Sequence, residues 1–127
     1  MSVTDEYLTY VIDQLYDLGP VTSRRMFGGA GLYCDGVMFA IVDDDMLYFK
    51  VDDGNRADYE AAGTDPFTYT TDRGTSTMSY YEVPIDVLEN KEQAARWAQK
   101  ALAVALEAKK NAKTKPPAKL KSKRKKK

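Results

Sequence analysis

The sequence predicts a two-layer α+β fold, in which helices pack against a five-stranded antiparallel sheet. Amphipathic patterns with helical spacing occur near both ends of residues 1–110. Between them lie short segments rich in β-branched and aromatic residues. Short turns join these segments, and short turns connect antiparallel rather than parallel strands. With one further helix in the middle, the expected order is α-β-β-β-α-β-β-α.

The first helix is expected from Asp5 to Leu18. Its apolar residues recur every three or four positions, at Leu8, Val11, Ile12, Leu15 and Leu18. Thr4 or Ser2 can cap its start. Gly19-Pro20 ends it, because proline cannot continue a helix.

Three strands follow, at about 30–34, 37–42 and 46–51. Asp35-Gly36 is a strong signal for a two-residue hairpin, and Asp43-Asp44-Asp45 forms the next short connection. The segment 37–42 is continuously apolar, which predicts a central strand covered on both faces. In 46–51 apolar and polar residues alternate, which predicts one buried and one wet face.

The second half of the chain adds a helix, a hairpin and a helix. Asn55 is expected to cap a helix from Arg56 to Ala62, which Gly63 ends. Strands at 67–71 and 77–81 form a hairpin around Asp72-Arg73-Gly74. An alanine-rich helix then runs from a capping box at Asn90 to about Lys110.

The residues expected to be largely buried come from both helical ends and from the strands. They are Leu8, Val11, Ile12, Leu15, Phe39, Ile41, Phe49, Phe67, Trp97 and Ala101.

The charge is divided sharply along the chain. Residues 1–108 hold all 19 acidic residues and eight basic ones, a net charge of −11. Residues 109–127 hold 11 basic residues and no acidic one. We therefore expect a folded domain over 1–110 and a disordered, lysine-rich tail over 111–127. Such a tail favours weak, non-specific binding of nucleic acid, and its candidate contacts are Lys119, Lys121, Lys123, Arg124, Lys125, Lys126 and Lys127.

Composition argues against most enzymatic chemistry. Histidine is absent, which excludes Ser-His-Asp and Cys-His catalysis and the usual zinc sites. Asp43-Asp44-Asp45 and the segment 52–55 lack the ligand spacing of a calcium loop, so we read them as turns. We expect no catalytic residue, no metal and no cofactor. The single Cys34, with no signal peptide and no membrane span in the sequence, predicts a cytoplasmic protein.

Several motifs occur together in order: Arg24-Arg25-Met26-Phe27-Gly28-Gly29, Leu47-Tyr48-Phe49-Lys50 and Ser79-Tyr80-Tyr81-Glu82-Val83-Pro84. Over roughly the first 108 residues the chain resembles the N-terminal domain of the TfoX/Sxy family, regulators of natural competence. The resemblance implies a two-layer fold similar to secretion chaperones and no catalytic residues. It also implies a transcriptional co-regulator, which in known members acts with the cyclic-AMP receptor protein. RNA polymerase is the other candidate partner. Longer members of the family carry a second, helical domain.

Two groups of residues are candidate contacts. Arg24 and Arg25 beside the glycine turn could bind an anion, but pairing with surface carboxylates is the favoured interpretation in an acidic domain. Tyr48, Lys50 and Tyr81 are the candidates for contact with a protein partner, because we expect them on an exposed face of the sheet.

Two functions remain open. The leading hypothesis is a non-enzymatic module for protein interaction and transcriptional regulation, with the tail adding weak affinity for nucleic acid. The alternative is a chaperone-like adaptor that binds a protein client and has no link to transcription.

Overall fold

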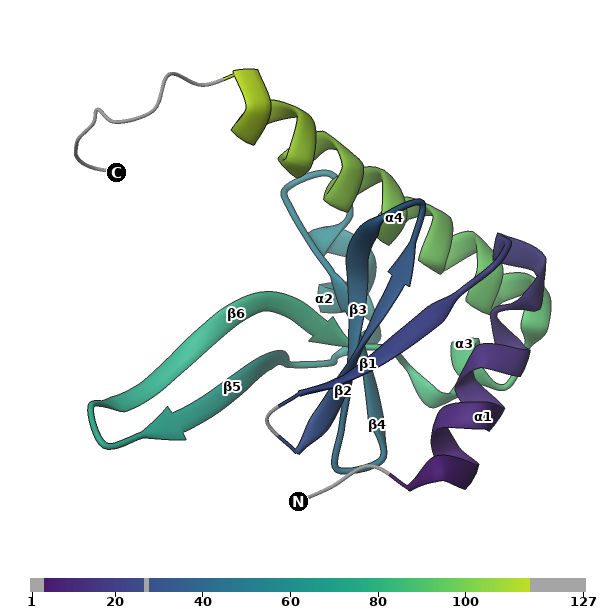
Figure 1. The fold of residues 1–127 in the computed structure, drawn as a ribbon, viewed down its shortest axis with the longest axis horizontal. Helices are drawn as coiled ribbons and strands as arrows, with labels where there is room; N and C mark the ends of the chain where they lie inside the picture. The colour runs from purple at the N-terminus through teal and green to yellow at the C-terminus, as the bar shows by residue number, and fades with distance from the viewer. Residues whose placement is uncertain (1–3, 27, 115–127) are drawn as a thin grey trace.

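The computed structural model describes residues 4–26 and 28–114, which form one antiparallel sheet with helices on one of its faces (Figure 1). The helices are α1 (Asp5–Gln14), the 3₁₀ turn η1 (Tyr16–Leu18), α2 (Arg56–Ala62), α3 (Ile85–Leu88) and α4 (Lys91–Thr114). The strands are β1 (Thr22–Met26), β2 (Gly29–Cys34), β3 (Val37–Asp43), β4 (Met46–Lys50), β5 (Pro66–Thr71) and β6 (Gly74–Glu82). The α+β class is confirmed.

The sheet has six strands in the order β1-β2-β3-β4-β6-β5, so the predicted count of five is wrong. The additional strand, β1, pairs along its whole length with β2. Its sequence, Thr-Ser-Arg-Arg-Met, has exposed residues at its first four positions and carries no apolar alternation. An edge strand of this kind is held by its backbone, so periodicity could not reveal it.

The predicted turns and caps are mostly confirmed. Asp35 and Gly36 both have positive φ, 54° and 81°, as a two-residue hairpin of this kind requires. The Thr4 hydroxyl accepts a hydrogen bond from the Tyr7 amide at 3.1 Å. Asn90 caps α4 by accepting from the Gln93 amide at 3.0 Å. Gly63 ends α2 in the left-handed conformation.

The core lies between the sheet and the helices. Val11, Leu15, Phe39, Phe49 and Ala101 are fully buried, and Leu8 nearly so. Ile12, Ile41, Phe67 and Trp97 are half-buried, and Ile12 and Trp97 pack against the core cluster. The register of β2 and β3 shifts after Leu32, which leaves Phe39 without a facing residue and allows Phe39 and Ala40 to be buried together.

The last helix continues beyond its predicted end. The sequence placed that end near Lys110, whereas α4 continues to Thr114. Up to Lys110, its last buried residue is Ala105, and residues 106–110 are exposed. The predicted tail contacts, from Lys119 to Lys127, lie outside the described residues.

Candidate functional site: the open sheet face

The sheet has one face covered by helices and one face that no helix of the described chain covers. Side chains alternate along each strand, and in β3 the irregularity at Phe39 shifts the alternation by one residue. Val37, Ala40 and Val42 therefore all point toward α4 and are buried. Met38 and Ile41 point the other way and are half-buried. The prediction that this strand is covered on both faces is therefore wrong.

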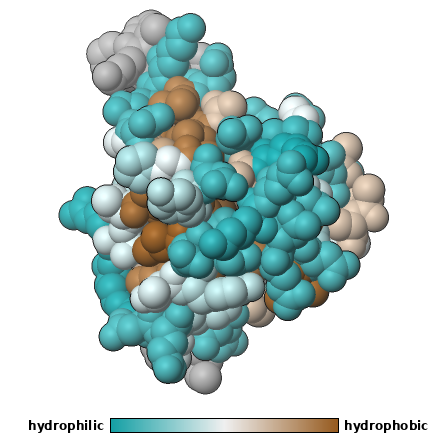
Figure 2. Space-filling view, turned by 90° about the vertical axis from the view of Figure 1, so that its right-hand side faces the viewer, coloured by the Kyte–Doolittle hydropathy of each residue, from teal (hydrophilic) through white to brown (hydrophobic). Residues whose placement is uncertain are grey.

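We call this surface the open sheet face. From the strand register it carries Arg24, Met26, Tyr33, Met38, Ile41, Met46, Tyr48, Lys50, Tyr80 and Glu82. None of the half-buried apolar residues in this group packs against the core cluster, whereas those on the helix side, such as Ile12 and Trp97, do. The opposite, helix-bearing side presents a mostly hydrophilic surface crossed by hydrophobic residues (Figure 2).

Glycines in β2 bring methionine side chains onto this face. A side chain at Gly31 would meet the Met38 sulfur at 2.6 Å and the Met26 methyl group at 2.9 Å. The two thioether chains therefore lie across the space that Gly31 leaves. Methionine is flexible and polarizable, and it is common on surfaces that adapt to a protein partner.

Two cations lie over tyrosine rings on the same face. The Lys50 ammonium is 5.0 Å from the centre of the Tyr80 ring, and the Arg24 guanidinium is 5.9 Å from that of Tyr33. Both distances allow cation–π attraction. Burial, and to a lesser extent Tyr33, raises the pKa of Tyr80 to about 12, which keeps its hydroxyl neutral. These contacts hold the two charged groups in place.

Tyr48 lies between aromatic and acidic neighbours. Its ring meets Phe67 edge-on, with 4.9 Å between the ring centres. Burial raises the pKa of the Tyr48 hydroxyl, and the carboxylates of Glu82, Asp43 and Asp44 add to this effect. The open sheet face thus combines an apolar centre with a tyrosine hydroxyl beside carboxylates.

The structure separates the sequence-predicted contact residues. Arg24, Tyr48 and Lys50 lie on the open sheet face, whereas Arg25 and Tyr81 lie on the helix side. Arg25 forms an ion pair with Asp5 of α1. The Tyr81 ring lies 5.8 Å from that of the buried Tyr59. Gly28 has a φ of 82°, and a side chain at Gly29 would meet the Val42 carbonyl oxygen at 2.5 Å, so these glycines serve the backbone.

The methionines were not predicted as contact residues. The available signal was their spacing: Met38 and Met46 fall on the same side as Ile41 and Tyr48 once the strands are set in register. Periodicity alone cannot say whether a second apolar face lies against helices or remains open.

Groups suited to metal binding are not assembled in the part of the chain that the structure describes. In residues 4–26 and 28–114 no three His, Cys, Asp or Glu side chains lie close enough to hold a metal ion. Burial, with the Asp35 carboxylate, raises the pKa of the Cys34 thiol, which disfavours the reactive thiolate. The described helices include none with the length and apolarity needed to cross a membrane.

Comparison with known proteins gives a consistent match. The family model for the TfoX N-terminal domain matches residues 13–105. The DNA transformation protein TfoX1 of Aliivibrio fischeri (strain ATCC 700601 / ES114) is 33% identical over 66 residues. That alignment covers 52% of this chain and 32% of the relative, so the chain matches about a third of the relative's length.

Proposed function

Because this chain belongs to the TfoX N-terminal domain family, we propose that it is a non-enzymatic regulatory domain that binds another protein through the open sheet face. The observation that carries the proposal is the set of half-buried methionine, isoleucine and tyrosine side chains on a sheet face without a helical cover. An apolar surface with fixed cations at its margin suits a partner with an apolar patch beside acidic groups.

The partner class belongs to the same proposal. A regulator of transcription and competence would act on a transcription factor, such as the cyclic-AMP receptor protein, or on RNA polymerase. Such a protein works in the cytoplasm, and the free, buried Cys34 is compatible with a reducing compartment. The lysine-rich C-terminal segment 109–127 adds weak, non-specific affinity for nucleic acid through its 11 basic residues.

The proposal is tested by direct binding of purified, nuclease-treated RNA polymerase and cyclic-AMP receptor protein to the immobilised chain. Lys50→Glu and Tyr48→Ala should each weaken binding about tenfold or more, equivalent to about 1.4 kcal/mol. Lys91→Glu is the matched control, because Lys91 is exposed at the start of α4 on the helix side. It should leave affinity within about twofold.

Two results would reject the proposal. One is equal loss of affinity in Lys50→Glu and Lys91→Glu, which would indicate a general charge effect rather than a binding face. The other is absence of binding to both transcription proteins. Binding of an unrelated client through the same face would instead support a chaperone-like adaptor.

A further inference from the structure

The hairpin of β5 and β6 projects away from the rest of the molecule. We call residues 66–79 the arm; in Figure 1 it extends to the left, far from the helices. Its described side chains are exposed except at Pro66, Phe67 and Met78, which are half-buried. Threonine and serine dominate it, and the Thr70 and Thr75 hydroxyls are 3.2 Å apart across the two strands. A lone two-stranded ribbon is marginally stable in water.

The outer edge of β6 has no strand beside it over half its length. β4 pairs with Tyr80, Tyr81 and Glu82, and the Val51 amide donates to the Ser79 carbonyl at 2.8 Å. Residues 74–77 pair with β5, Met78 lies at a shift in register, and β4 pairs with none of these five residues. This stretch, Gly-Thr-Ser-Thr-Met, contains no charged residue and no proline. Proteins normally protect an exposed strand edge with charged residues or proline. An edge without them can pair with an added strand.

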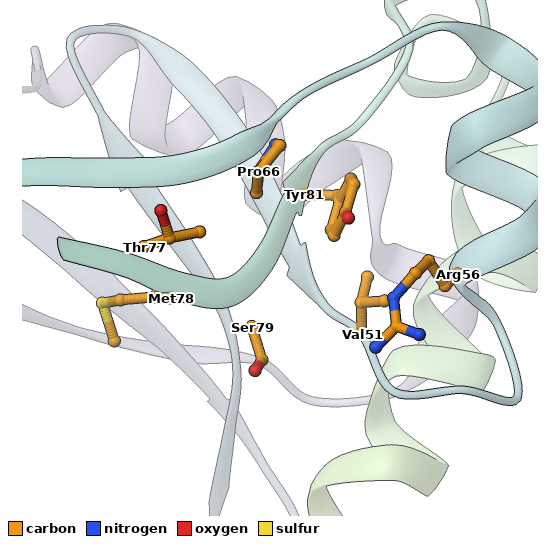
Figure 3. Close-up of a pocket in the computed structure, with 7 residues that line it drawn as sticks. All are labelled: Val51, Arg56, Pro66, Thr77, Met78, Ser79 and Tyr81. Carbon is orange, nitrogen blue, oxygen red and sulfur yellow. The ribbon is translucent and has the colours of Figure 1, made fainter.

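A hollow lies at the base of the arm, where β4 ends and the chain turns toward α2. Its volume is about 200 Å³, and it is lined by Val51, Arg56, Pro66, Thr77, Met78, Ser79 and Tyr81 (Figure 3). Arg56 forms an ion pair with Asp53 at 2.5 Å. A strand added to β6 would run directly into this hollow.

We propose that two copies of this chain pair antiparallel through the outer edges of their β6 strands, each arm tip entering the hollow of the other copy. A two-fold axis makes this contact self-complementary, because the same edge faces itself. If the axis passes near Ser76, the tip residues Asp72 and Arg73 of one copy reach the level of Ser79 in the other. There they meet the Arg56 and Asp53 pair, so opposite charges face each other in both directions.

A second copy fits this edge better than a foreign peptide. The edge offers backbone pairing and short hydroxyl side chains at Thr75, Ser76 and Thr77. The unpaired length of the edge equals that of an identical arm. The charged residues at the tip, Asp72 and Arg73, complement those at the base, Arg56 and Asp53. The contact is small, so a reversible dimer is expected.

Sedimentation velocity of the full chain tests this inference independently of any partner protein. The mass should rise with concentration from 14.3 kDa toward twice that value. Self-association should persist near 1 M salt, where the Debye length is about 3 Å and attraction between tail and acidic domain is screened. A chain that stays monomeric at the highest attainable concentration would overturn the proposal, as would a dimer that dissociates at high salt.

Charge substitution identifies the edge. Thr75→Lys with Thr77→Lys places lysines opposite lysines across the two-fold axis, and at physiological salt this double variant should be monomeric with an unchanged circular dichroism spectrum. Thr75→Glu with Thr77→Glu should behave in the same way. An equimolar mixture of the two should regain the dimer mass, because opposite charges then face each other. Failure of the mixture to recover would contradict the two-fold pairing.

Thr22→Lys is the matched control, since Thr22 is exposed on β1 at the opposite edge of the sheet. This variant should dimerise as the parent chain does. Loss of the dimer in Thr22→Lys, or retention of the dimer in the double lysine variant, would show that the arm edge is not the interface.

Discussion

At Gly29 the backbone of β3 leaves no space for a side chain. The Cβ of an alanine there would lie 2.5 Å from the Val42 carbonyl oxygen, a backbone atom that cannot move without disturbing the sheet. Gly29→Ala should therefore lower the free energy of unfolding by about 1–3 kcal/mol. Gly31→Ala is the matched comparison, because its neighbours are the flexible ends of Met38 and Met26. Its loss should be clearly smaller, and equal losses in urea denaturation would disprove the difference.

The buried hydroxyl of Tyr59 predicts how stability changes at alkaline pH. Burial, followed by the Asp58 carboxylate, raises the pKa of Tyr59 in the folded state. Below pH about 10 the group is neutral in both states and contributes nothing to the pH dependence. Above that pH the unfolded chain loses the proton and the folded chain keeps it, so the free energy of unfolding falls as pH rises.

Tyr59→Phe removes this ionisation from the unfolded chain. Above pH about 10, the free energy of unfolding of the variant should therefore fall less steeply with pH, by about 1.4 kcal/mol per pH unit. Near pH 7 the variant should be no less stable than the parent, because the Tyr59 hydroxyl has no hydrogen-bond partner among the described residues. Urea denaturation at several pH values measures both quantities. If the free energy of unfolding falls equally steeply with pH in variant and parent above pH about 10, the raised pKa of Tyr59 is contradicted.

The sequence predicted the turns more reliably than the hydrogen-bond partners of individual side chains. Asp35-Gly36 and Thr4 were predictable because local backbone geometry alone decides them. Asn55 was not, because the expected cap of α2 does not form. Its amide instead accepts from the Asp52 backbone at 2.8 Å and donates to the Lys50 carbonyl at 3.1 Å. The hydrogen-bond partners of the Asn55 amide depend on where β4 ends, and the sequence pattern does not predict that end.

The junction between β4 and α2 depends on this buried amide, which is 3% exposed. Asn55→Ala should cost about 1–3 kcal/mol, because a backbone donor and a backbone acceptor lose their partner. Asn90→Ala removes a solvent-exposed cap of α4 and should cost about 1 kcal/mol. Chemical denaturation compares the two variants. A larger loss in Asn90→Ala would show that the junction tolerates the missing hydrogen bonds.

Among the secondary-structure elements, the helices and inner strands were predictable, and the edges were not. α1 and α4 carry strong 3.6-residue patterns. β1 has no such pattern, and the four-residue α3 after Pro84 is too short to show one. The open sheet face was found only in part: Tyr48 and Lys50 were among the candidates, while Tyr81 lies on the other side. A strand's periodicity separates two faces without saying which one the helices cover.

For the whole molecule, the division of charge predicts which part binds nucleic acid. A chain that ends at Lys110 should keep its fold, because every residue that the structure describes as buried lies at or before Ala105, and it should lose retention on duplex DNA. For the full chain, the slope of log affinity against log salt should be shallower than about −10, because fewer than 11 charges engage at once. Electrophoretic mobility shift measures both. A truncated domain that still shifts DNA at physiological salt would place binding on the sheet.

The single tryptophan of the chain gives the molecule a built-in optical reporter. Trp97 of α4 stands edge-on to Tyr59 of α2, with 4.8 Å between ring centres, and Tyr59 in turn contacts Tyr81 of β6. Energy absorbed by these tyrosines is transferred to Trp97 and emitted as tryptophan fluorescence, and this transfer requires α2 and α4 to remain packed on the sheet. A change in mass without a change in energy transfer would therefore show that association leaves α2 and α4 packed on the sheet.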